Sequence, residues 1–355
     1  MAIDIHDFGT TEHGEAAHLI TLTNRNGVVM KVTTYGGAIT ELHLPDRDGR
    51  MADCVLGFDN LRQYETDSPS FGCCCGRVAN RIRDGRFTLD GKTHQLPLNY
   101  HGKHHIHGGP RGFGKRVWSY TTHQTPAGPS VTFTHASPDG EEGYPGGLDA
   151  TMTYTLTDDN ALVLTYEATA AAPTIVNLTN HSYFNLAGCD AGVVMDHQLK
   201  INAETVTVVD DYLVPTGEFA SALDGPFDFT EPKTIGRDID QLADTPAHGY
   251  DVNYCLDNPD GDLVLAATCF DPTSGRIMHV YTDQPGMQLY TGNMLKETFG
   301  GKGVDVFRKH AGVCFETQKY ADAINHPAFP SIVLRPGETY THRCEYRFDV
   351  ADAIE

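Results

Sequence analysis

The sequence predicts an all-β protein, built as a large antiparallel sandwich or barrel. Extended segments in which apolar and polar residues alternate recur along the chain of 355 residues. The 36 glycines and 19 prolines interrupt these segments at short intervals, as turns do. Helical periodicity is scarce. Many short strands separated by close turns are typical of sandwiches and barrels.

The first clear strand pair is predicted near the amino terminus. Residues 28–34 and 38–44 both alternate, and Tyr35-Gly-Gly37 between them is a turn signal. Pro45-Asp-Arg-Asp-Gly49 then predicts a further turn.

Later segments continue the same pattern to the end of the chain. Short helices are expected only at 60–64 and 235–243. The sequence contains no fixed-period repeat, no low-complexity tract and no linker-like change in composition, so one domain over residues 1–355 is predicted. Further strands are predicted at 117–122, 131–135, 150–157, 161–169, 174–176, 263–270, 276–281 and 339–348.

The composition excludes several classes of protein. Apolar residues make up 40% of the chain, which is enough for a core, and no run of 18 apolar residues predicts a membrane span. Acidic residues outnumber basic ones 47 to 26, for a formal charge of −21. This field repels phosphate backbones, so a nucleic-acid partner is not expected. The acids are dispersed, which is typical of a solvated surface.

The nine cysteines predict free thiols in a reducing cytoplasm. Cys73, Cys74 and Cys75 are consecutive, and no C-x-x-C pair occurs, so neither a disulfide framework nor a zinc-site spacing is present. Glycosylation sequons at Asn177 and Asn180 would place glycans on a polar strand end, which also disfavours a secretory route. The acidic first residues lack an apolar segment, so no signal peptide is expected. The pattern suggests no role for the three consecutive cysteines.

A polar strand end at 177–188 is the first candidate site. This stretch follows two predicted strands and is rich in Asn, Thr, Ser and Tyr, which offer many hydrogen-bonding groups. Within it, His181 can exchange a proton near neutral pH. The alternative is a strand end whose side chains satisfy local backbone groups.

A second candidate is the carboxylate of Glu316, which lies in an otherwise apolar strand at 312–320. Burial among Val, Cys and Phe would raise its pKa toward the working pH, as a general base requires. The alternative is an outward-facing Glu. Val313 and Phe315 share one face while Glu316 shares the other with Cys314, so alternation leaves both possibilities open.

Asn80 and Arg81, in the segment Gly76–Ile82, could hold ligand oxygens. Arginine donates in a fixed fork, and asparagine both donates and accepts. The alternative is an arginine paired with one of the many acids. Asp251 among aromatic residues and Gln288 at a polar strand end are further candidates.

A histidine-rich loop and a glycine-rich loop follow. Four histidines fall within 101–107, and metal binding is conceivable, but no H-E-x-x-H or Cys/His framework supports it. His107 is the candidate, because the next two glycines let a ligand approach the backbone. Residues 109–115 fit G-x-x-x-x-G-K. Arg116 stands where Ser or Thr should hold magnesium, so a chance match is expected.

Taken in order, these motifs resemble those of the aldose 1-epimerase, or galactose mutarotase, family, from about Gly27 to the end. The run Asn180-His-Ser-Tyr-Phe-Asn-Leu186 is the most specific. One departure is Val252, where family members often have histidine after the aspartate. The resemblance is carried by residues 53–59, 76–82, 107–109, 180–186, 288–293 and 316–318.

The resemblance implies a large antiparallel β-sandwich, the galactose mutarotase-like supersandwich. It makes Glu316 the general base and His181 the general acid. No metal or organic cofactor is expected, and the partner is a small-molecule aldose bound by a monomer or a homodimer. The substrate-contact positions that it implies are Asn80, Arg81, His107, Asp251 and Gln288.

The implied activity is the interconversion of α and β anomers of free hexoses such as galactose and glucose. The base removes the C1 hydroxyl proton while the acid protonates the ring oxygen, so Glu316 is expected to be ionised and His181 protonated at the outset. One alternative is an epimerase for sugar phosphates, with Arg77, Arg81 and Arg111 serving the phosphate. The other is a carbohydrate-binding protein without chemistry.

Overall fold

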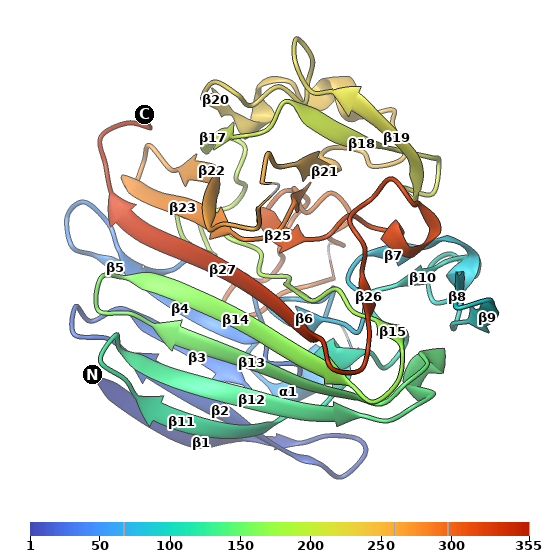
Figure 1. Cartoon of the computed structure of the whole chain (residues 1–355). Helices are drawn as coiled ribbons and strands as arrows, with labels where there is room; N and C mark the ends of the chain where they lie inside the picture. The colour runs from blue at the N-terminus through green and yellow to red at the C-terminus, as the bar shows by residue number, and fades with distance from the viewer. Residues whose placement is uncertain (67, 259, 297, 355) are drawn as a thin grey trace.

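The structure is a computed structural model that describes residues 1–66, 68–258, 260–296 and 298–354. Three antiparallel sheets hold most of the strand residues (Figure 1). Among the described residues the only α-helix is α1, Leu61–Thr66, close to the helix predicted at 60–64. The all-β antiparallel sandwich predicted from the sequence is confirmed.

The largest sheet has nine strands and runs through the whole molecule. Its strands pair antiparallel, and its two edge strands are short or polar. In sheet order it comprises β11 (Ser119–Gln124), β12 (Pro129–Ser137), β13 (Leu148–Leu156), β14 (Ala161–Ala170), β27 (Thr339–Val350), β23 (Arg276–Thr282), β22 (Val264–Phe270), β17 (Gln198–Ile201) and β20 (Lys233–Thr234).

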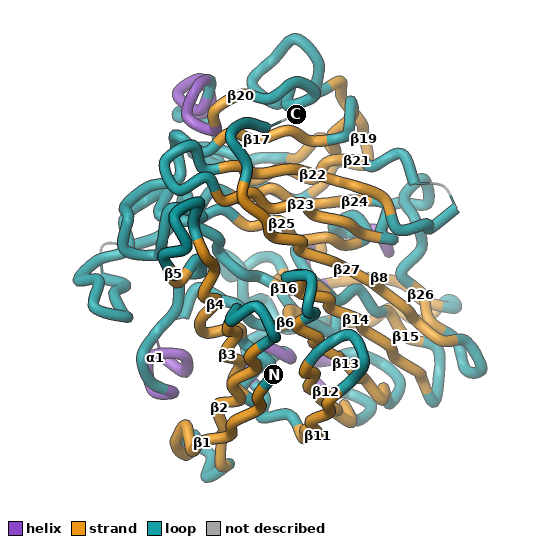
Figure 2. The backbone as a smooth tube through the Cα atoms, turned by 90° about the vertical axis from the view of Figure 1, so that its left-hand side faces the viewer, coloured by secondary structure: helices purple, strands orange, loops and turns teal. Residues whose placement is uncertain are grey.

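A five-stranded sheet from the amino-terminal region faces one half of this large sheet (Figure 2). Alternation buries Leu22 and Met30 in the same hydrophobic cluster as Phe133 and Tyr154 of the large sheet. The first two strands were not predicted from the sequence, and the first of them is largely exposed. The sheet comprises β1 (Ala2–Thr10), β2 (Ala16–Thr23), β3 (Val29–Thr33), β4 (Ile39–Pro45) and β5 (Met51–Asp53).

The third sheet positions the candidate site. Its central and last strands are buried on both faces. One face packs on the large sheet, and there Tyr346 Oη donates to Phe315 O over 2.9 Å. The opposite face carries polar side chains, because strand residues alternate between faces. The strands are β19 (Pro215–Ser221), β18 (Thr205–Val209), β21 (Asp251–Cys255), β24 (Gly286–Tyr290) and β25 (Cys314–Gln318).

Short strand pairs carry the loops that surround this polar face. The stretch predicted as a helix at 235–243 forms two 3₁₀ turns, Ile235–Arg237 and Ile239–Leu242. The pairs are β6 (Cys74–Cys75) with β16 (Thr179–Asn180), β7 (Arg81–Ile82) with β10 (His105–Ile106), β8 (Arg86–Leu89) with β9 (Lys92–Gln95), and β15 (Thr174–Ile175) with β26 (Val333–Leu334).

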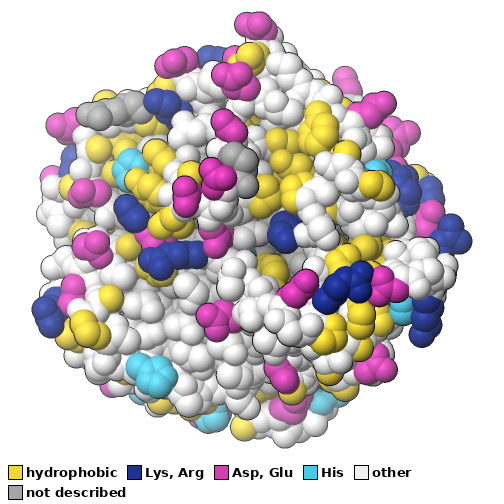
Figure 3. All heavy atoms as spheres, viewed as in Figure 1, with side chains coloured by type: hydrophobic (Ala, Val, Ile, Leu, Met, Phe, Trp, Pro, Cys, Tyr) yellow, Lys and Arg dark blue, Asp and Glu magenta, His cyan; other side chains and the backbone are white. Residues whose placement is uncertain are grey.

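The surface agrees with the charge pattern of the sequence. On the face shown in Figure 3, Asp and Glu side chains are scattered, with Lys and Arg between them. Within the described ranges, no helix has the length and apolar character that a membrane span needs. The single-domain organisation, the cytoplasmic location and the oligomeric state stay predictions.

Candidate active site

A cavity of about 210 Å³ opens on the polar face of the third sheet. It admits a ligand of roughly monosaccharide size, and residues from seven separate segments of the chain line it. Six of the seven site residues predicted from the sequence line it, so the fold brings together positions up to 236 residues apart (316 − 80). These six are Asn80, Arg81, His107, His181, Asp251 and Glu316.

Glu316 and His181 face each other across one wall of the cavity. Glu316 Oε1 lies 3.6 Å from His181 Nε2, and the two residues are 2% and 5% exposed. The second carboxylate oxygen of Glu316, Oε2, is buried and has no hydrogen-bond partner among the residues that the structure describes. A buried acceptor without a partner is costly, so this oxygen is available to a ligand hydroxyl.

Burial controls the protonation of this pair. Desolvation, aided by the charge of Asp251, raises the pKa of Glu316 well above its usual value. Desolvation also lowers the pKa of His181 to about 4. The expected starting state of ionised Glu316 and protonated His181 is therefore not the one that these surroundings favour. Both side chains prefer their neutral forms, because the cavity wall removes water from either charge.

The neutral pair and the ion pair nevertheless contain the same number of protons. They differ only in whether one proton resides on Glu316 or on His181 Nε2, so a single transfer interconverts them. A hydroxyl group that donates a hydrogen bond to Glu316 Oε2 stabilises the carboxylate. The equilibrium between the neutral pair and the ion pair then shifts toward the ion pair.

Contacts at Nδ1 and at the ring face hold the imidazole of His181. Cys314 Sγ lies 3.5 Å from its Nδ1, and the ring stacks on Tyr183 with centroids 5.1 Å apart. The backbone is fixed as well, since His181 N–H donates to Cys73 O over 2.9 Å. These contacts orient Nε2 toward Glu316 and the cavity.

Asp251 and Arg81 form a buried ion pair on the neighbouring wall. Arg81 Nη2 donates to Asp251 Oδ2 over 3.0 Å, and Gln288 Nε2 donates to Asp251 Oδ1 over 2.5 Å. Gln288 does not line the cavity; it holds the aspartate that does. The guanidinium of Arg81 also lies 4.7 Å from the ring centroid of Tyr100. Charge on this wall is therefore balanced before any ligand binds.

His107 is locked in one tautomer. Asn80 N–H donates to His107 Nδ1 over 3.1 Å, and burial lowers the pKa of the imidazole well below its usual value. The neutral ring therefore carries its proton on Nε2 and can donate to a hydroxyl. Gly108, at φ +82°, is required beside it, because a Cβ there would lie 1.6 Å from Gly76 O.

The same tautomer argues against a metal centre at this position. Ligand atoms of His107, His181 and Glu316 lie within 4.8 Å of one another, which is close enough to hold an ion. A metal on His107 would need either the nitrogen that already accepts from Asn80 or the nitrogen that carries the proton. The site therefore suits a hydroxyl-bearing ligand better than a cation.

The other histidines of the loop have structural roles. His105 is hydrogen-bonded to Tyr144 Oη (2.7 Å) and Pro97 O (2.8 Å), and burial lowers its pKa to about 4. His104 Nδ1 accepts from Asp84 N–H over 2.9 Å. Of the four histidines within 101–107, His107 alone lines the cavity.

Arg77 has a structural role as well. Its guanidinium is buried and donates to Ser137 Oγ and to the carbonyl of Gly146 (2.7 Å). Arg111 is partly exposed and lies 3.9 Å from Glu15. Neither lines the cavity, so two of the three arginines considered for a phosphate are absent from its wall.

Several lining residues were missed from the sequence. Tyr183 lies within the Asn180–Leu186 run, so a signal for it existed. Tyr100, Ser70 and Met294 come from loops without any pattern that marks them.

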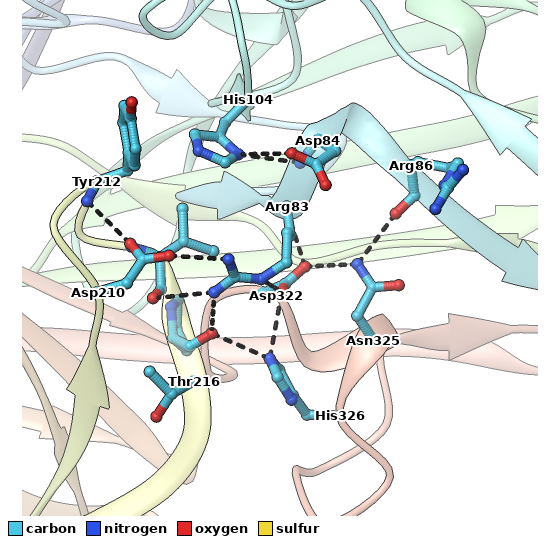
Figure 4. Close-up of polar contacts among 12 residues, drawn as sticks. Arg83, Asp84, Arg86, His104, Asp210, Tyr212, Thr216, Asp322, Asn325 and His326 are labelled. Carbon is cyan, nitrogen blue, oxygen red and sulfur yellow. Dashed lines mark hydrogen bonds and ion pairs between the residues drawn. The ribbon is translucent and has the colours of Figure 1, made fainter.

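A second polar network surrounds Arg83, and its labelled residues do not line the cavity (Figure 4). Arg83 Nη1 donates to Asp210 Oδ2 over 2.8 Å, and Arg83 N–H donates to Asp322 Oδ1 over 3.0 Å. Asp322 also donates its own N–H to Arg81 O over 2.9 Å, and its Oδ2 lies 3.2 Å from His326 Nε2. The network thus ties the turn after β25 to the segment that carries Arg81.

Comparisons with known proteins point to one family. The family described as Aldose 1-epimerase matches residues 18–347. Galactose mutarotase from Rattus norvegicus is 46% identical over 320 residues, covering 90% of this chain and 91% of the relative. Aldose 1-epimerase from Escherichia coli (strain K12) is 35% identical over 340 residues, covering 94% and 96%.

Solved structures agree. An aldose epimerase homologue from C. elegans superposes with a TM-score of 0.85 at 31% identity, covering 95% of this chain and 100% of that one. Galactose 1-epimerase from Lactobacillus acidophilus NCFM gives a TM-score of 0.85 at 28% identity, covering 99% of both chains.

Proposed function

The chain belongs to the aldose 1-epimerase family, and from this premise we propose that it interconverts the α and β anomers of free hexoses through Glu316 and His181. The observation that carries the proposal is the 3.6 Å approach of Glu316 Oε1 to His181 Nε2 beside a cavity, with Oε2 of the carboxylate unpaired. The relatives named galactose mutarotase make galactose the first substrate to test.

In the proposed reaction Glu316 accepts the proton of the C1 hydroxyl, and His181 donates a proton to the ring oxygen. The C1–O5 bond breaks, and the open-chain aldehyde rotates about its C1–C2 bond. The ring then closes on the other face of C1, with both proton transfers reversed. No proton is gained or lost overall, so the pair ends each cycle in its starting state.

Sugar binding prepares the pair for this reaction. The C1 hydroxyl donates to Glu316 Oε2 and stabilises the carboxylate, which moves the shared proton to His181 Nε2. The enclosed cavity keeps water from competing for the same groups.

The remaining polar side chains hold the other sugar hydroxyls. Asp251 accepts, while Arg81 and His107 Nε2 donate, and Asn80 can do either. Gln288 acts on the sugar through Asp251, whose orientation it sets. Tyr290 lines the same cavity and offers an aromatic face to the pyranose.

Free sugars are favoured over sugar phosphates. Arg81 is the one predicted phosphate-binding arginine on the wall, and its charge is already matched by Asp251 at 3.0 Å. The second alternative, binding without chemistry, does not require two buried proton-transfer groups in contact. Burying them costs free energy that a binding protein could avoid.

Polarimetry tests the proposal. Fresh α-D-galactose and α-D-glucose are followed with wild-type protein, with His181→Asn and with Glu316→Gln. Faster approach to the same final rotation, lost in both variants, supports the assignment. Unchanged turnover in Glu316→Gln would exclude Glu316 as the base, and no acceleration by wild type would favour the alternatives.

A further inference from the structure

The three consecutive cysteines point in two directions. Cys74 packs in the large core cluster, whereas Cys73 and Cys75 both belong to the cluster on the other side of the segment. This is the alternation expected of an extended segment. Two thiols therefore share one face.

That face lines a cavity of about 140 Å³ next to the sugar site. Cys73, Cys75 and Lys115 contribute to its wall, and Ser70 and His107 line both this cavity and the sugar cavity. Although each thiol is more than nine-tenths buried, a small molecule that enters this cavity meets both sulfurs.

The local sequence makes room for the first sulfur. A Cβ on Gly114 would lie 2.6 Å from Cys73 Sγ, so glycine is the residue that leaves this position open.

The hydrogen bond between the two thiols shifts their pKa values in opposite directions. The hydrogen bond from Cys75, with a smaller contribution from the positive charge of Lys115, lowers the pKa of Cys73 below that of an ordinary thiol. The same hydrogen bond and burial raise the pKa of Cys75. One sulfur thus has nucleophilic character, and the other holds a proton beside it.

The segment is connected to the acid of the proposed reaction. His181 N–H donates to Cys73 O over 2.9 Å, and Gly72 N–H donates to His181 O over 3.0 Å. Cys75 is paired with Thr179, two residues before His181. A change in the backbone at Cys73 therefore moves His181 directly.

We propose that Cys73 and Cys75 form a dithiol modification site for small peroxides, and that its oxidation to a disulfide stops catalysis by displacing His181. The loss of activity rests on the proposed function, whereas the chemistry at the two sulfurs does not. Cys73 thiolate attacks one peroxide oxygen, the O–O bond breaks, and the leaving hydroxide takes up a proton as water. Cys75 sulfur then attacks the Cys73 sulfenic acid, loses its proton, and releases the second water.

Hydrogen peroxide is the probe, applied to the intact chain with and without saturating galactose. Mutarotation is followed by polarimetry relative to each protein's own untreated rate. Activity is expected to fall by roughly tenfold or more, to return with dithiothreitol, and to be protected by galactose. The peptide 63–77 should lose two hydrogen atoms in mass, with Cys74 as its alkylatable thiol.

Cys73→Ser and Cys75→Ser should resist inactivation, while Cys255→Ser, which removes the half-buried thiol on β21, should respond as wild type. The proposal is overturned if wild type shows no bond between Cys73 and Cys75 in the mass spectrum, or if Cys73→Ser is inactivated at the wild-type rate. If the disulfide forms without loss of activity, the modification site is supported, but the claim that it controls catalysis through His181 is refuted. A protein that forms the disulfide but has no epimerase activity before treatment contradicts the proposed function instead.

Discussion

Glu316 Oε1 lies 3.6 Å from His181 Nε2 inside a wall that leaves both side chains almost without solvent. Desolvation acts on the two groups in opposite directions, raising the pKa of Glu316 and lowering that of His181. The two shifts favour the state in which Glu316 holds the one exchangeable proton of the pair. That single proton is what an anomer exchange needs.

The pH profile of kcat/KM for the free enzyme should have its acid limb well below the usual histidine value. His181, with a pKa lowered to about 4, takes up a second proton only below that pH, and the pair then lacks a base. The alkaline limb should lie above the ordinary carboxyl range, because Glu316 loses the shared proton only above its raised pKa. Initial rates by polarimetry, corrected for the buffer-catalysed reaction, measure both limbs. An acid limb centred near the ordinary histidine pKa would contradict the desolvated pair.

Removing either proton-transfer group should abolish most of the chemistry while leaving the fold intact. Glu316→Gln and His181→Asn are each expected to lower kcat by about 10²–10⁴-fold, the usual contribution of a positioned acid or base. Sugar binding, measured by calorimetry, should persist in Glu316→Gln, since the amide still occupies the same wall. Loss of binding and turnover together would point to a structural role for Glu316.

Asp251→Asn should mainly weaken binding. The amide cannot balance the buried charge of Arg81, which Asp251 now contacts at 3.0 Å, and it accepts sugar hydroxyls less strongly. KM is expected to rise about 10–100-fold, in line with the loss of one charged hydrogen bond, with a smaller change in kcat. Gln288→Leu should shift KM in the same direction but less, since it frees Asp251 without removing its charge. A kcat effect larger than the KM effect in Asp251→Asn would place Asp251 in the proton transfer.

Asp322→Ala should lower stability and leave an active enzyme with a raised KM. Its buried carboxylate accepts from Arg83 N–H (3.0 Å) and Asn325 Nδ2 (2.6 Å), so its loss removes the acceptor of Arg83 N–H and leaves Asn325 Nδ2 with its bond to Arg86 O alone. The expected decrease in the free energy of unfolding is about 2–3 kcal/mol, measured by urea denaturation. Asp90→Ala is the matched control, because Asp90 has a similar positive φ but pairs with Arg335 at the surface, so it should change the denaturation midpoint less. Equal effects in the two variants would contradict a bracing role for Asp322.

Gly108→Ala tests the backbone beside His107. Gly108 has φ +82°, and an added Cβ would meet Gly76 O at 1.6 Å, so the loop must move. We expect a lower melting temperature and a rise in KM, because His107 Nε2 would leave its place on the cavity wall. Gly91→Ala, at φ +78° with no atom within 4 Å of the new Cβ, controls for the strain of positive φ alone. Wild-type KM in Gly108→Ala would show that the loop position does not matter for binding.

The sequence by itself determined the strand content and the chemical inventory of the site. Alternation with a period of two is a local consequence of backbone geometry, so segments such as 161–169 could be assigned without their partners. The polar strand end around His181 and the lone carboxylate of Glu316 were also visible, because unusual residue types stand out against an apolar background. Strands β1 and β2 contain no such unusual residue against an apolar background, and they were not predicted from the sequence.

Only the tertiary structure decided how these pieces act together. Glu316 sits on a strand buried on both faces, so its direction depended on which sheet covers each face. Arg81 and Asp251 are 170 residues apart, and they pair because the fold brings both to the wall of one cavity. The neutral forms that Glu316 and His181 favour arise from desolvation by several separate segments of the chain. Burial is a property of the assembled molecule, and no local pattern in the chain contains it.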